Sequence, residues 1–144
     1  MPTPSAYLAR LGTFAVLLHA AISFAHGYAH RELDVQLNQF QTVYVAIVIT
    51  IAPLLAAILL WTRFARLGLF LLALSMAGSL ALEIYLHNIE VSPDNVAHLP
   101  QGDHQGLFRV TALLLTVSEA IGCAVGIWGV IKLHATRRKD ASIY

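Results

Sequence analysis

The chain has 144 residues, of which 58% are hydrophobic and only 12% carry a charge, and its formal net charge is +1. Soluble domains average about 25% charged residues, and half of that amount cannot cover the water-facing surface of a small domain. The composition therefore predicts an integral membrane protein whose main partner is the lipid bilayer, and it excludes a nucleic-acid-binding surface, which needs a strong positive charge.

Four long apolar runs, separated by polar segments, set the predicted architecture. They span residues 11–29, 43–61, 67–86 and 107–133. Each is near or above the roughly 20 residues that a helix needs to cross about 30 Å of hydrocarbon. Because lipid offers the backbone no hydrogen bonds and barrel strands are shorter, the runs should be helices. We expect an all-α membrane protein over residues 1–144, a single four-helix transmembrane up-down bundle with helices at about 7–30, 41–62, 67–90 and 107–134.

The first run also resembles a secretory signal peptide. Arg10 precedes it, and the small residues Ser23 and Ala25 stand before His26 as they would at a cleavage site. His19 would be unusual inside such a segment. We therefore expect a first helix that is retained.

The lysines and arginines are distributed unevenly between the two sides of the predicted bundle. Only Arg31 and Arg109 lie on the side of the two long polar loops. The other seven lie on the side of the termini, namely Arg10, Arg63, Arg66, Lys132, Arg137, Arg138 and Lys139. Membrane proteins keep such residues on the cytoplasmic side. We expect a multi-pass protein of the cell membrane with both termini in the cytoplasm.

Ionisable side chains inside the predicted helices form two stripes and one isolated position. These are His19, His26 and His30 on the first helix, Glu83, His87 and Glu90 on the third, and Glu119 on the fourth. Within each stripe the residues share one face, at about 100° per residue. An ionisable group within a membrane is costly and by default marks function. The stripes should therefore face one another inside the bundle.

The main functional prediction is a transition-metal site near the extracytoplasmic end of the bundle. The proposed ligands are His26, His30, Glu83 and His87, with His19 deeper in the bundle and His98 and His104 in the last loop as further candidates. Imidazole and carboxylate together suit zinc, copper or iron. No HExxH motif is present, and Glu83 and His87 are one residue too far apart for the Glu-x-x-His of di-iron bundles.

Two alternatives give the same residues another role. A b-type haem would sit between His26 or His30 and His87, as in four-helix membrane cytochromes. A proton or metal transfer protein would use the line of histidines that ends at Glu119 and His19.

A third alternative is a structural subunit without a cofactor. In that case Glu83 would pair with His26, and Glu119 with His19, to fix the helix register.

No reaction can be named from the sequence. If the metal is catalytic, Glu83 or Glu119 is the candidate general base beside a metal-bound water.

Gly122, Gly126 and Gly129 form a small-residue face that predicts close helix packing, within the bundle or between protomers. A homo-oligomer or a larger membrane complex is expected because the chain has almost no soluble mass.

Overall fold

The computed structural model describes the backbone of residues 4–141 and the side chains of residues 6–135. This part of the chain is helical and contains no strand. The elements are α1 (Pro4–Glu32), α2 (Gln39–Tyr44), the π-helix η1 (Val45–Ile51), α3 (Ala52–Leu60), α4 (Ala65–Ile84), the π-helix η2 (Tyr85–Ile89) and α5 (Gln105–Ala141). The side chains of Arg137, Arg138 and Lys139, on which part of the orientation prediction rests, lie outside the described part.

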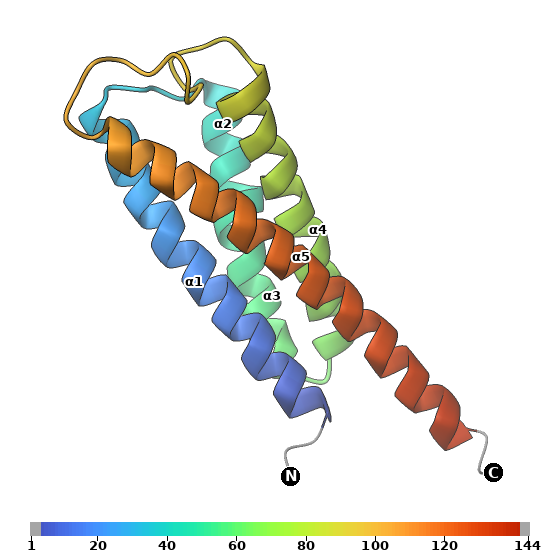
Figure 1. Cartoon of the computed structure of the whole chain (residues 1–144). Helices are drawn as coiled ribbons and strands as arrows, with labels where there is room; N and C mark the ends of the chain where they lie inside the picture. Colours follow the sequence, from blue (N-terminus) through green and yellow to red (C-terminus); the bar gives the residue numbers. More distant parts are fainter. Residues whose placement is uncertain (1–3, 142–144) are drawn as a thin grey trace.

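The elements combine into four rods. α2, η1 and α3 are continuous, as are α4 and η2, so that the rods long and apolar enough to cross a membrane are Ala6–Glu32, Gln39–Leu60, Ala65–Ile89 and Gln105–Ala135. This confirms the prediction of an all-helical chain with four such helices. Figure 1 shows them alternating in direction, and α5 packs against both α1 and α4.

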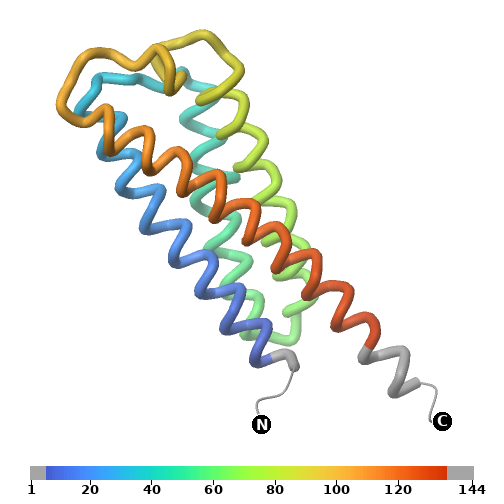
Figure 2. The backbone as a smooth tube through the Cα atoms, viewed as in Figure 1, coloured from blue at the N-terminus to red at the C-terminus, as the bar shows by residue number. Residues whose placement is uncertain are grey.

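The two ends of the bundle differ in their connections. The segments 33–38 and 90–104 lie together at one end, whereas the short turn at residues 61–64 lies at the other, where α1 begins and α5 ends (Figure 2). We call these the loop end and the terminal end. The loop-end segments cover an apolar cluster of Ala29, Leu33, Val35, Leu99 and Phe108.

Glycines hold the helices close together toward the terminal end. A Cβ atom at Gly126 would lie 2.7 Å from the backbone nitrogen of Ala73, and one at Gly129 would lie 2.6 Å from Leu69. A Cβ atom at Gly122 would likewise meet Met76 at 2.8 Å. All three glycines of the predicted small-residue face therefore pack α5 against α4 within one chain.

The π-helix η2 lies at the loop end and η1 lies near the middle of its rod, and the sequence did not predict them. η1 ends shortly before Pro53. Proline has no N–H, so the carbonyl of Ile49 lacks the donor that residue 53 would give in a regular helix. η2 carries His87. Short π-helical stretches of this kind are frequent at functional sites.

Candidate metal centre

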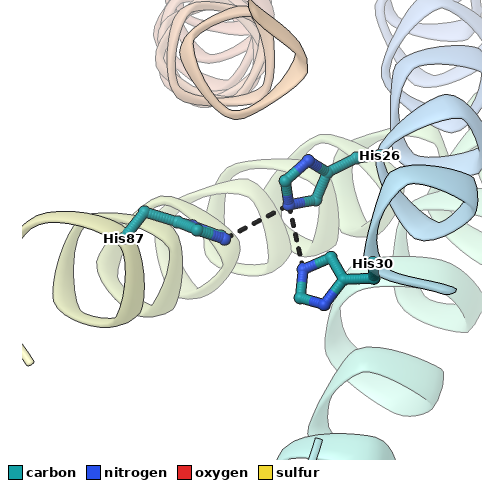
Figure 3. Close-up of side chains that lie close together, drawn as sticks. All are labelled: His26, His30 and His87. Carbon is teal, nitrogen blue, oxygen red and sulfur yellow. Dashed lines mark hydrogen bonds between the residues drawn. The ribbon is translucent and has the colours of Figure 1, made fainter. Parts of the chain in front are cut away.

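Three histidines from two rods converge at the loop end of the bundle. His26 and His30 come from successive turns of α1, and His87 comes from η2 (Figure 3). The Nε2 atom of His26 lies 3.2 Å from that of His87 and 3.1 Å from that of His30. The three ligand atoms all lie within 4.8 Å of one another, so the group could hold a metal ion.

Asp94 adds a carboxylate to this group from the last loop. Its Oδ1 atom lies 3.3 Å from Nε2 of His30 and 3.1 Å from Nε2 of His87. The side chain is 8% exposed, and neither oxygen accepts a hydrogen bond within the described part of the chain. A buried carboxylate without donors is costly unless a cation lies nearby.

Hydrogen bonds place Asp94 against the helices. The Val96 amide donates to the carbonyl of His87 at 3.0 Å, and the side-chain amide of Asn95 donates to the carbonyl of Glu90 at 2.9 Å. Farther along, Nε of Arg109 donates to the Val96 carbonyl at 3.1 Å. The two residues that follow Asp94 are therefore bound to the end of η2 and to α5.

The second nitrogens of His30 and His87 face hydrogen-bond acceptors. Nδ1 of His30 lies 3.1 Å from the carbonyl of Val35. Nδ1 of His87 lies 3.1 Å from the carbonyl of Glu83 and 3.2 Å from its Oε1 atom. Both acceptors require a proton on Nδ1, which assigns the free lone pair of each neutral ring to Nε2.

His26 has the same tautomer for a similar reason. Its Nδ1 atom lies 2.8 Å from the hydroxyl oxygen of Thr111. That hydroxyl has one proton, which it donates to the carbonyl of Leu107 at 2.7 Å. Thr111 is thus an acceptor toward His26, and the Nε2 lone pair of His26 also points into the group.

With these tautomers, the Nε2 lone pairs of the three histidines and the Asp94 carboxylate face one another, and none of these groups has a proton to donate. A proton on Nε2 of His87 would satisfy Asp94, but it would leave the lone pairs of His26 and His30 opposed at 3.1 Å. A metal ion removes every one of these conflicts. Nitrogen ligands about 2.0–2.1 Å from a tetrahedral ion lie about 3.3–3.4 Å apart, close to the separations found.

Glu83 lies beside the group, next to His87. Its carboxylate contacts Nδ1 of His87, the nitrogen that faces away from the group. Metal-binding histidines are commonly oriented by a carboxylate or carbonyl at their second nitrogen. The arrangement suits Glu83 to orienting His87. The sequence-based alternative paired Glu83 with His26, whereas the structure pairs it with His87.

The other predicted site residues lie elsewhere. His19 and Glu119 form a separate pair farther from the loops, with 3.9 Å between Nδ1 and Oε1. His98 is exposed, with Nδ1 3.4 Å from the side-chain oxygen of Asn95. The ring of His104 packs edge-on against Tyr28. None of these four belongs to the group of His26, His30 and His87.

Sequence reasoning missed two residues of the site. Asp94 lies in an irregular loop, where helical spacing gives no guide to position. Thr111 could have been found from helical periodicity. It lies with Phe108 and Leu115 on the buried face of α5, and a threonine on that face could have been matched to the histidine stripe.

Two cavities meet at Asp94. One of about 210 Å³ lies against the three histidines and includes Glu83, Val35 and Asp94 in its walls. The other, of about 500 Å³, is more polar and is lined by Asp34, Glu90 and Asp94, among others. We call the second cavity the acidic vestibule. Asp94 and Val35 belong to both, so the vestibule is the natural path for a cation to the histidines.

Comparison with protein-family models, curated proteins and solved structures gives no match for this chain. The functional argument therefore rests on the geometry of the site.

Proposed function

We propose that this is an integral membrane protein that binds one transition-metal ion at the loop end of its bundle, with His26, His30 and His87 as ligands. The observation that supports it most strongly is the convergence of three Nε2 atoms, with that of His26 3.2 Å from His87 and 3.1 Å from His30, while each Nδ1 is engaged by an acceptor. Asp94 is the proposed fourth ligand. A set of three imidazoles and one carboxylate suits zinc, with copper and iron as the other ions that imidazole binds well.

The geometry favours an ion over a haem. A porphyrin needs its two axial nitrogens on opposite faces of a large ring, whereas here the nitrogens are in mutual contact. Phe108 also packs against the rings of His26 and His30, with centroids 4.6 and 4.9 Å away.

Membrane insertion is the second part of the proposal. Large apolar side chains project from the bundle along its length, including Phe14, Phe24, Ile58, Leu74 and Leu113, each at least 64% exposed. Such a surface suits lipid. The distribution of Lys and Arg then places the termini in the cytoplasm and the metal centre at the extracytoplasmic face.

Metal content tests the site. Protein purified in detergent should contain, or take up, one zinc per chain by mass spectrometry. His26→Ala and His87→Ala should each lose it, whereas His98→Ala and His104→Ala, at the same end of the bundle, should keep it. A metal-free protein that takes up no added zinc, copper or iron would overturn the proposal, and a strong visible absorption band would instead indicate haem.

Cysteine labelling tests the orientation. In a Cys123→Ala background, a cysteine placed at Val91 in the loop should react with a membrane-impermeant maleimide in intact cells. A cysteine placed at Thr62, in the turn at the terminal end, should react only after the cells are opened. The reverse pattern would contradict the proposed topology.

A further inference from the structure

A second polar site lies between α1 and α5, away from the loops. Nδ1 of His19 and Oε1 of Glu119 are 3.9 Å apart, and the two side chains are 1% and 0% exposed. His19 precedes His26 by seven residues, which places the pair roughly 10 Å along the helix from the metal centre. Neither carboxylate oxygen of Glu119 has a hydrogen-bond partner within the described chain, and the same holds for Nδ1 of His19.

The other nitrogen of His19 faces acceptors. Nε2 lies 3.4 Å from the carbonyl of Ile49 and 3.4 Å from the hydroxyl oxygen of Ser23. In an α-helical register the Ile49 carbonyl would accept from residue 53, and Pro53 has no N–H to offer it. A neutral His19 therefore carries its proton on Nε2 and directs the lone pair of Nδ1 toward Glu119.

Glu119 is thus a buried carboxyl group that faces a lone pair. As a carboxylate it would be an unsolvated charge without a single donor, which is among the costliest arrangements inside a protein. As a carboxylic acid it has an O–H to direct at Nδ1 of His19. One proton on the pair satisfies both partners once the 3.9 Å separation closes to hydrogen-bond distance.

We propose that His19 and Glu119 form a proton-binding site in which Glu119 is kept as a neutral acid beside His19. This site is separate from the proposed metal centre and does not depend on it. The pair holds one exchangeable proton: its transfer to Nδ1 gives an imidazolium and a carboxylate, and its release leaves one negative charge on Glu119.

The neighbouring elements carry few titratable groups near Glu119. From α4 and η2 these are Glu83 and His87, which contact each other at 3.2 Å. The remaining rod, Gln39–Leu60, contributes one titratable side chain, Tyr44, whose hydroxyl donates to the carbonyl of Gly78 at 3.1 Å. No arginine or lysine in the described part of the chain forms an ion pair with Glu119.

A cavity gives the pair a route for proton exchange. It has a volume of about 250 Å³ and is lined by His19, Ser23, Ile49 and Thr50, among others. A water molecule occupies about 30 Å³ of liquid, so the cavity has room for several. Ser23 and the Ile49 carbonyl lie at the Nε2 edge of His19, so the imidazole can take the proton of Glu119 on Nδ1 and release its own proton from Nε2 toward the cavity.

Carbodiimide labelling tests the proposal on the full chain. Dicyclohexylcarbodiimide reacts with protonated carboxyl groups in apolar surroundings and spares ionised ones in water. We expect one adduct per chain on Glu119 at mildly alkaline pH, located by peptide mass spectrometry and lost in Glu119→Gln. The exposed Glu32 is the internal control and should remain unlabelled. The adduct should persist in the His26→Ala/His87→Ala variant, so that failure of the metal proposal would leave this one standing.

Infrared spectroscopy provides a second measurement that does not require a reagent to reach the site. The protein should show the carbonyl stretch of a protonated carboxylic acid. The band should disappear in Glu119→Gln, remain in Glu83→Gln, and shift in His19→Leu because the hydrogen-bond partner is gone. If no carbonyl band is lost in Glu119→Gln and no adduct forms on Glu119, the proposal is wrong.

Discussion

The terminal and loop halves of the bundle differ in how their interiors are packed. Toward the terminal end, glycines on α5 bring its backbone against Ala73 and Leu69 of α4, and apolar side chains fill the interior. Toward the loop end, the π-helix η2, several cavities and a group of histidines replace this close packing. The close packing of the terminal half therefore holds the rods together. The loop half contributes less apolar burial and can position polar groups instead.

The largest expected effect is the loss of a ligand in the loop half. His26→Ala should weaken zinc binding by more than about 100-fold, because even the loss of an outer-shell partner commonly costs 10–100-fold. Isothermal titration in detergent measures the change. His104→Ala, which removes a histidine in contact only with Tyr28 among the ring contacts described, should bind zinc normally. Equal affinities for the two variants would show that His26 is not a ligand.

A smaller loss is expected when the support of His26 is removed. Thr111→Val leaves Nδ1 of His26 without its acceptor, and zinc affinity should fall about 10–100-fold. Thr116→Val is the matched control, because the Thr116 hydroxyl donates only to the Ala112 carbonyl one turn away. Unchanged affinity in Thr111→Val would mean that the assigned tautomer of His26 is wrong.

The terminal half can be tested by its packing. Gly126→Ala places a methyl group 2.7 Å from the backbone of Ala73 and should destabilise the fold by about 1–3 kcal/mol. Gly27→Ala, on α1 in the loop half, meets nothing within 4 Å and should be neutral or stabilise by up to about 1 kcal/mol. Unfolding in detergent compares the two variants. Equal stabilities would contradict the division between a tightly packed and a loosely packed half.

The smallest expected effect concerns the acidic vestibule. Asp34→Asn combined with Glu90→Gln should slow zinc association by less than about tenfold, because negative charge at the vestibule raises the local cation concentration. The difference should shrink at high salt. Stopped-flow measurement of uptake tests this, with Glu32→Gln, outside the vestibule lining, as the control. If the rates match at low salt, cations reach the histidines by another path.

How far the sequence predicts this molecule depends on the regularity of each part. The four helices follow from apolar runs long enough to cross a membrane, and His26, His30 and His87 follow from helical periodicity. Asp94 does not, because a loop hydrogen-bonded to both neighbouring helices decides its position. The partner of Glu83 also depends on side-chain placement: the i, i+4 contact to His87 on its own rod is made in place of one to His26 across the bundle.

X-ray absorption at the zinc edge tests the central claim most directly. On zinc-loaded protein in detergent, three imidazoles and a carboxylate predict a first shell of nitrogen and oxygen at about 2.0–2.1 Å. Outer-shell scattering from three imidazole rings should accompany it and fall to two rings in His26→Ala. A first shell of oxygen alone, without imidazole scattering, would contradict the assignment of His26, His30 and His87 as the ligands.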